Sequence, residues 1–271
     1  MLTLFSTPTT AIEAMTWAIA FAVVQQTLEL LALRSAMADQ GVWAWPILRR
    51  EFAGGSRLAQ AVTDGLLRYP NILGVLVIRL GAALLVFVAP PLPCLLIMLA
   101  TTLLISIRWR GTFNGGSDSM TMIILSALTI DVAFGDSNPM VGLACVWYVA
   151  LAAVNSYALA GFAKLRESTW RSGAALGVFV NTSVHGPLAR GRSVLRRRVP
   201  ARVISWVVLA LECGFPLVLV DPAWCYGFIT LALAFHIANA YVFGLDRFLF
   251  VWVATYPALL CCSGSGLPGA G

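Results

Sequence analysis

Lys164 is the residue whose type and position most suggest a chemical role. The stretch NSYALAGFAKLREST, residues 155–169, begins as apolar helix and carries Tyr157 before it reaches Lys164. Tyr157 lies seven positions before Lys164, which places the two side chains on one helix face. A poorly solvated lysine can act as a base, whereas a lysine at a helix end can extend its ammonium group to lipid headgroups. The pattern alone leaves both roles open, and we predict that Lys164 points inward, toward Asp118 or Tyr157.

Other polar residues lie deep in apolar stretches, where each needs a partner or a water-filled cavity. Arg79 stands about 14 Å into its stretch at about 1.5 Å per residue, and Glu212 lies at a similar depth in another. We expect these two to form an ion pair, with Glu29 as the alternative acid. His236 and Asn239 are in the middle of a later stretch. Together these residues form either a polar network that holds the helices together or a pocket for a polar or quinone-like ligand.

The composition indicates a membrane protein. The chain has 271 residues, of which 59% are hydrophobic and 11% are charged, with a mean hydropathy of +0.85. Soluble domains carry about 25% charged residues. The sequence has no zinc-type Cys/His spacing, no Walker loop and no GxGxxG motif. Its six cysteines form no CxxC pair, so we expect buried packing residues, with a disulfide at the outer face as the alternative.

The apolar stretches predict an all-α bundle of about eight transmembrane helices, because about 20 apolar residues cross the hydrocarbon. The predicted spans are residues 11–33, 71–88, 91–107, 119–135, 140–164, 203–221, 224–243 and 246–262.

The basic residues support this count. The segments that join alternate spans hold every lysine and arginine except Arg79, which is 17 of 18. Under the positive-inside rule these segments are cytoplasmic, so both termini are predicted to be outside the plasma (inner) membrane.

We assign residues 1–271 to one domain. Three segments of this domain are not predicted to span the membrane. Residues 43–69 are too polar to cross and suit the membrane interface. Residues 166–202 form a basic cytoplasmic loop that we expect to rest on anionic lipid, and no nucleic acid is expected as a partner. Residues 263–271 predict a flexible tail. The N-terminal segment has no basic residue before its apolar run and is expected to be retained rather than cleaved.

Three stretches together resemble the HTTM membrane domain, which is shared with vitamin K-dependent gamma-carboxylases. They are RWRGTFNGGSDSMTMIILSAL at 108–128, YALAGFAKLRESTWRSGAAL at 157–176 and FHIANAYVFGLDRFLFVWVATYP at 235–257. Their order matches that of the family, and the resemblance covers residues from about 70 to 263.

The resemblance implies two different functions. In the carboxylases a membrane lysine matching Lys164 is implicated as the base that deprotonates reduced vitamin K. A carboxylase histidine falls where this chain has Gly116. One implied function is therefore a bacterial accessory or peptide-maturation membrane protein. The other is a quinol- or lipid-dependent enzyme, with Lys164 as base and Asp118, Tyr157 and His236 around the pocket.

The expected cofactor of such an enzyme is a quinone or quinol. Membrane lipids and a protein in the membrane are the expected partners. A transporter is a third class, but the chain shows no internal repeat.

Overall fold

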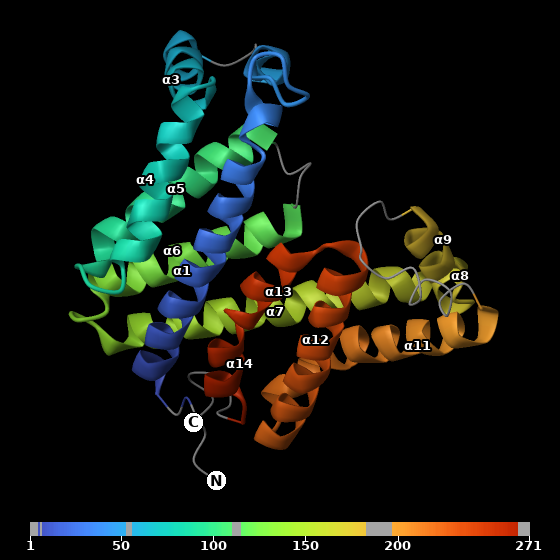
Figure 1. The fold of residues 1–271 in the computed structure, drawn as a ribbon. Helices are drawn as coiled ribbons and strands as arrows, with labels where there is room; N and C mark the ends of the chain where they lie inside the picture. Colours follow the sequence, from blue (N-terminus) through green and yellow to red (C-terminus); the bar gives the residue numbers. More distant parts are fainter. Residues whose placement is uncertain (1–4, 6, 53–55, 110–114, 183–196, 265–271) are drawn as a thin grey trace. The chain divides into compact units, whose positions relative to one another are not determined.

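The computed structural model describes residue 5 and residues 7–52, 56–109, 115–182 and 197–264, and all regular elements in these residues are helices (Figure 1). The all-α class is therefore confirmed. The elements in chain order are α1 (Pro8–Ala32), η1 (Arg34–Met37), α2 (Trp45–Leu48), η2 (Arg49–Phe52), α3 (Arg57–Leu67), α4 (Asn71–Leu85), α5 (Pro91–Trp109), α6 (Gly115–Phe134), α7 (Pro139–Arg166), α8 (Ser168–Arg171), α9 (Ala174–Thr182), α11 (Arg198–Gly214), η3 (Phe215–Leu219), α12 (Pro222–Phe243), α13 (Asp246–Val253) and α14 (Tyr256–Cys262).

The chain divides into two compact units, which are described separately below. The first-half unit is Thr16–Val141, and the second-half unit is Gly142–Gly271 together with Met1–Met15. The assignment of residues 1–271 to one domain stays a prediction.

Six helical segments in the described residues are long and apolar enough to cross a membrane: α1, α5, α6, α7, α11 continued by η3, and α12. A seventh is counted if α3 and α4, which meet at an angle of 75°, form one broken span. Large apolar side chains on several of these helices are exposed, including Phe21, Leu103, Tyr148 and Leu159. Lipid is the environment that covers such surfaces, so the protein is a multi-pass membrane protein.

The last predicted span is not one helix. Residues 246–262 form α13 and α14, which are separated at Ala254 and Thr255. Pro257 is the second residue of α14. A backbone N–H at this position has no acceptor within the helix, so a proline there costs no hydrogen bond. In the interior of a continuous helix this proline would remove a hydrogen bond, which explains the break.

α12 shows how the sequence sets helix ends. The side chain of Asp221 accepts a hydrogen bond from the backbone N–H of Ala223 at 2.7 Å, and Pro222 begins the helix. Gly244 ends it in the left-handed conformation, with φ of +71°. The helix therefore covers the predicted span 224–243 and begins two residues before it.

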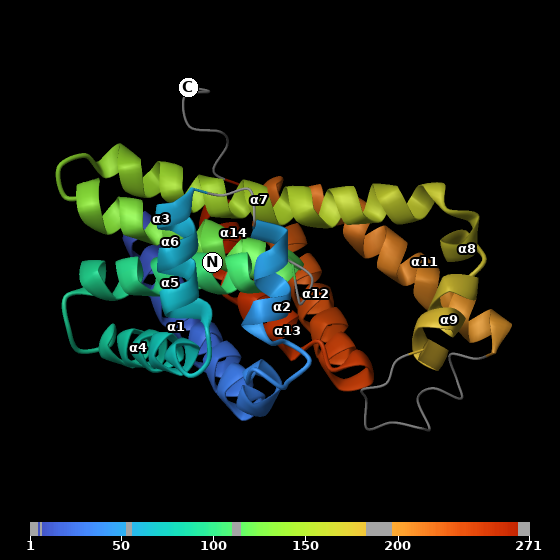
Figure 2. The ribbon, with the colours of Figure 1, turned by 90° about the horizontal axis from the view of Figure 1, so that it is seen from above.

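In the first-half unit, α5 packs against α4 on one side and α6 on the other, and both views show these helices side by side (Figures 1 and 2). Arg108 is fully buried near the end of α5 and holds the segment before α4 against this helix. Its guanidinium donates to the carbonyl of Leu67, to that of Trp43 at 2.7 Å and to that of Met37 at 3.4 Å. It also lies 5.2 Å from the ring centre of Trp109.

The second-half unit contains α7, α11 and α12, with the short helices α8 and α9 near the end of α7 and the start of α11 (Figures 1 and 2). Both short helices pack on α11. They occupy the first part of the predicted 166–202 loop, while residues 183–196 of that loop lie outside the described residues, as do residues 265–271 of the tail.

Candidate functional site

The centre of the candidate site is an ion pair between Lys164 of α7 and Glu212 of α11. The Lys164 ammonium group meets the Oε1 atom of the Glu212 carboxylate. The Lys164 side chain is 23% exposed and that of Glu212 is 3% exposed. The lysine therefore points to a neighbouring helix of its own unit, and its partner is Glu212 rather than Tyr157 or Asp118.

A glycine lets α7 and α11 come close enough for this pair. Gly161 precedes Lys164 by three residues and so lies on the same helix face. A Cβ atom at Gly161 would be 2.7 Å from the backbone nitrogen of Cys213 and 2.8 Å from the Cβ of Glu212. Only a residue without a side chain fits this distance.

Trp170 of α8 covers the ammonium group from another side. The Lys164 Nζ atom lies 5.3 Å from the centre of the Trp170 ring, which is within range of a cation–π interaction. The Trp170 carbonyl accepts a hydrogen bond from the Ser205 hydroxyl of α11, and the Arg171 carbonyl accepts one from the Trp206 indole at 3.1 Å. These contacts hold α8 and its tryptophan against α11.

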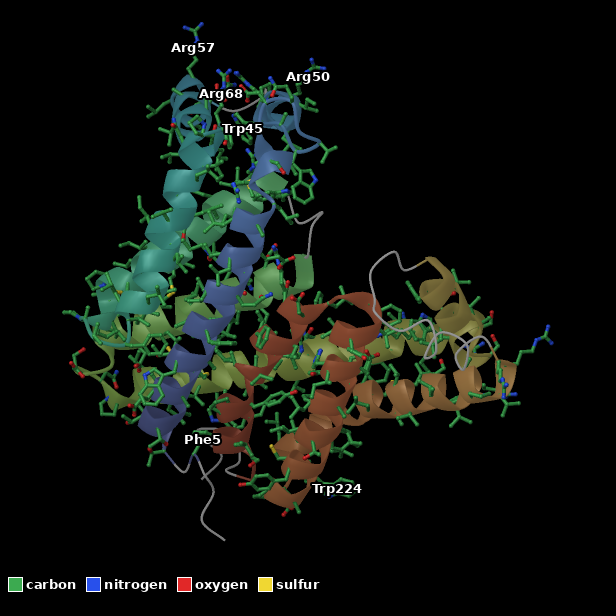
Figure 3. All side chains as sticks on the ribbon, in the orientation of Figure 1. Phe5, Trp45, Arg50, Arg57, Arg68 and Trp224 are labelled. Carbon is green, nitrogen blue, oxygen red and sulfur yellow. The ribbon has the colours of Figure 1, made fainter. Side chains whose placement is uncertain are left out.

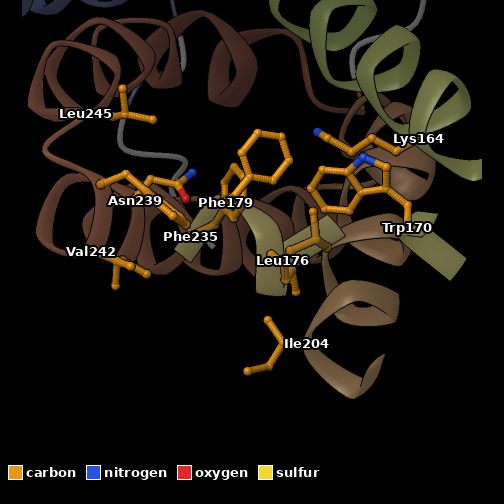
Figure 4. A pocket seen from close by; sticks show the side chains of 12 residues that line it. Lys164, Trp170, Leu176, Phe179, Ile204, Phe235, Asn239, Val242 and Leu245 are labelled. Atoms are coloured by element: carbon orange, nitrogen blue, oxygen red, sulfur yellow. The ribbon is translucent and has the colours of Figure 1, made fainter. Parts of the chain in front are cut away.

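A cavity of about 430 Å³ opens beside this pair (Figure 4). Its lining consists of Lys164, Trp170, Leu176, Phe179, Ile204, Val208, Phe235, Ala238, Asn239, Val242, Phe243 and Leu245. Lys164 and Trp170 lie on one side in Figure 4, and Asn239 with Val242 on the other. The lining is apolar apart from a few polar groups, so it suits an apolar molecule with a polar end.

A second buried pair joins α7 to α12. The Tyr157 hydroxyl and the His236 Nε2 atom are 2.6 Å apart, and either can donate, depending on the imidazole tautomer. The Tyr157 ring stacks on Phe215 with centroids 3.8 Å apart. Two buried polar atoms of this unit, Glu212 Oε2 and His236 Nδ1, have no hydrogen-bond partner among the described residues. Such atoms are typical of sites that hold a water molecule or a polar ligand group.

Arg79 belongs to the first-half unit and has its own set of acceptors. It donates to Gln26 Oε1 at 3.0 Å and to Thr27 Oγ1 at 3.1 Å. It also donates to the Thr102 hydroxyl and to the Met98 carbonyl. The expected pairing of Arg79 with Glu212 is thus replaced by the Lys164–Glu212 pair, because Glu212 has that lysine beside it within its own unit.

The remaining predicted residues fall in different places. Asp118 is buried in the first turn of α6, in the first-half unit, and Gly116 lies just before it. Asn239 lines the Lys164 cavity. The structure thus brings Lys164 and Asn239 to one cavity, pairs Lys164 with Glu212, and places Tyr157 beside His236.

Sequence reasoning missed the aromatic wall of the cavity. Trp170, Phe179 and Phe235 have no ionisable group, so the pattern of polar residues does not mark them as site residues. Phe235 adjoins His236, and the GAALGVFV run at 173–180, which forms most of α9, is apolar within a basic loop. That run was the available signal.

The described residues hold no group of three or more His, Cys, Asp or Glu side chains suited to a metal ion. The six cysteines are free thiols, and four of them are buried, as expected for packing residues.

The fold and site therefore define a multi-pass, all-α membrane protein with a lysine at an apolar cavity. A family model, the HTTM domain, matches residues 119–264, which is more than half of the chain. The chain belongs to the HTTM domain family. Neither the curated proteins nor the solved structures contain a match to it.

Proposed function

We propose that this chain is a bacterial accessory or peptide-maturation membrane protein that binds an amphiphilic membrane molecule in the Lys164 cavity. The observation that supports this is the position of one ion-paired lysine at the wall of an otherwise apolar cavity. A volume of about 430 Å³ is typical of ligand pockets. The apolar wall accepts a chain or ring system, and the Lys164 ammonium and Asn239 amide bind the polar end.

Two features favour an accessory role over catalysis. The Lys164 side chain is held in an ion pair with Glu212, which is the contact of a structural or ligand-positioning charge rather than of a free base. In addition, Gly116 stands where the resembling carboxylases have a histidine, and an incomplete catalytic set loses most of its rate.

The alternative is a quinol- or lipid-dependent enzyme related to the gamma-carboxylases, with Lys164 as base. The hydrogen bond between Tyr157 and His236 favours it, because a buried phenol and imidazole in contact can transfer a proton. A quinone fits the lining, since its ring and tail suit the apolar wall and its oxygens suit Lys164 and Asn239. When bound as a quinol, such a group supplies a hydroxyl proton.

The same proposal includes an eight-span topology in the inner membrane. α4 is the second span, and α13 with α14 is a broken eighth span. Both termini are outside, and the basic segments are cytoplasmic.

A cavity-filling variant tests ligand binding. Ala238→Trp places a large side chain in the lining without altering the ion pair, while Ala234→Trp adds the same side chain one turn earlier on α12, outside the lining. Lipids and quinones extracted from the purified chains are identified by mass spectrometry. A molecule retained by the wild type and by Ala234→Trp but lost from Ala238→Trp supports the proposal. Equal retention by all three chains contradicts it.

Lys164→Arg separates the two functions, because arginine keeps the positive charge but cannot act as a base at neutral pH. The host process that requires the protein is compared at equal protein abundance. Retained function in Lys164→Arg supports the accessory role, and lost function at normal abundance supports the enzyme.

A further inference from the structure

α3 presents its apolar face outward. Leu58, Val62 and Leu66, spaced one turn apart, are 76%, 49% and 39% exposed. The helix meets α4 at 75°, so it turns away from the direction of that apolar helix. An amphipathic helix with this orientation suits the membrane interface, with its apolar face among the acyl chains.

The other face of α3 borders a polar cavity of about 400 Å³ within the first-half unit. Its lining consists of Trp45, Pro46, Arg49, Arg50, Gln60, Thr63 and Asp64. The residues from α3 are spaced three and four apart, on the face opposite the apolar one. If the apolar face lies among acyl chains, the cavity is at the depth of the lipid headgroups.

Asp64 organises this cavity with both of its carboxylate oxygens. Its Oδ1 atom accepts a hydrogen bond from the Trp45 indole at 2.7 Å, and its Oδ2 atom pairs with Arg49 at 3.0 Å. Arg50 has no hydrogen-bond or ion-pair partner among the described residues and is exposed (Figure 3). Since Asp64 and Arg49 neutralise each other, the described residues that line the cavity leave one arginine, Arg50, without an acidic partner.

We propose that this cavity binds the phosphate of an anionic phospholipid. A phosphodiester carries one negative charge, which matches the one uncompensated arginine, and guanidinium groups bind phosphate oxygens in a bidentate manner. The exposed apolar face of α3 selects a lipid over a free phosphate ion, because it keeps the cavity against the membrane. This site is separate from the Lys164 cavity and does not depend on the function proposed for it.

Arg50→Gln and Arg57→Gln form a matched pair of variants. Both arginines are exposed and near α3, but Arg57 does not line the cavity (Figure 3). Native mass spectrometry of the purified full chain measures binding of short-chain phosphatidylglycerol, short-chain phosphatidylcholine and inorganic phosphate. One arginine near an anionic headgroup contributes about 1 kcal/mol, so Arg50→Gln is expected to weaken phosphatidylglycerol binding about fivefold. Arg57→Gln is expected to leave it unchanged.

Equal loss of binding in both variants overturns the proposal, because binding would then reflect diffuse surface charge. No loss in either variant also overturns it, because the lipid would then bind at another site. Inorganic phosphate that binds as tightly as phosphatidylglycerol overturns the assignment to a lipid. The wild-type chain gives a measurement that needs no variant: binding of phosphatidylglycerol is expected to exceed that of phosphatidylcholine and to fall with rising salt. Equal binding of the two lipids is the contrary result.

Discussion

Arg79 illustrates, at the scale of single residues, how this chain accommodates a buried cation. Its guanidinium donates to two side chains of α1 and to a side chain and a carbonyl of α5. Gln26 extends the network by donating to Thr121 of α6 at 3.2 Å. The arginine therefore links helices of the first-half unit through hydrogen bonds that hydrocarbon cannot replace.

Arg79→Leu is expected to destabilise the protein by about 2–4 kcal/mol, because several buried acceptors lose their donor. Thermal unfolding of the purified chain in detergent measures the loss. Thr102→Val and the double variant complete a cycle in which the two changes are expected to be non-additive. Additive effects would show that the Arg79–Thr102 contact contributes nothing.

Lys164→Met is expected to cost about 3–5 kcal/mol, because it leaves the Glu212 carboxylate buried without its cation. Adding Glu212→Gln removes the uncompensated charge, so the double variant is expected to unfold at a higher temperature than Lys164→Met alone. A double variant no more stable than the single one would contradict the ion pair.

The sequence identified Lys164, Glu212, Tyr157 and His236 as residues in need of partners, but it paired Glu212 with Arg79. Depth along a helix can be counted from the sequence, whereas the helix faces that meet are set by packing. Gly161 indicates that another helix approaches α7 closely beside Lys164, but the sequence does not indicate that this helix is α11.

At the scale of elements, the contact between α7 and α11 depends on that glycine. Gly161→Ala is expected to destabilise the chain by about 1–3 kcal/mol, because the new Cβ atom meets the α11 backbone and pushes the helices apart. Gly177→Ala in α9 is the control: its Cβ atom would have no neighbour within 4 Å, so a gain of about 0.5–1 kcal/mol is expected. Thermal unfolding compares the two. A neutral Gly161→Ala would refute the close approach.

Arg108 has the corresponding role in the first-half unit, where it holds the segment before α4 against α5. Arg108→Met removes donors from three backbone carbonyls, so faster hydrogen–deuterium exchange is expected in η1, α2 and the end of α3. Arg68→Gln breaks the exposed Arg68–Asp39 pair nearby and is expected to change exchange little, since exposed pairs contribute at most about 1 kcal/mol. Equal exchange in the two variants would contradict the role of Arg108.

Long helices could be predicted well from apolar runs and from turn residues such as those that bound α12. The short helices α8 and α9 could not, because four- and nine-residue helices inside a basic segment have little apolar periodicity. These two helices supply Trp170 and Phe179 to the wall of the cavity, so the cavity could not be predicted from the sequence.

For the whole molecule, the distribution of basic residues predicts which loops face the cytoplasm. Single cysteines introduced by Ser137→Cys and Ser193→Cys are tested with a membrane-impermeant thiol reagent on intact cells, against the background of the parent chain. Labelling at position 137 and not at position 193 is expected. The opposite pattern would invert the topology.

The bend between α3 and α4 leaves a short span in that topology. α4 has 15 residues, which is about 22 Å at 1.5 Å per residue, whereas the hydrocarbon layer is about 30 Å thick. In the proposed eight-span topology α3 turns away and adds no length to this span, so we expect the bilayer beside α4 to be thinner. The protein is therefore expected to unfold at a higher temperature in bilayers of short-chain lipids than in bilayers of long-chain lipids, and to gather in the thinner regions of a mixed membrane.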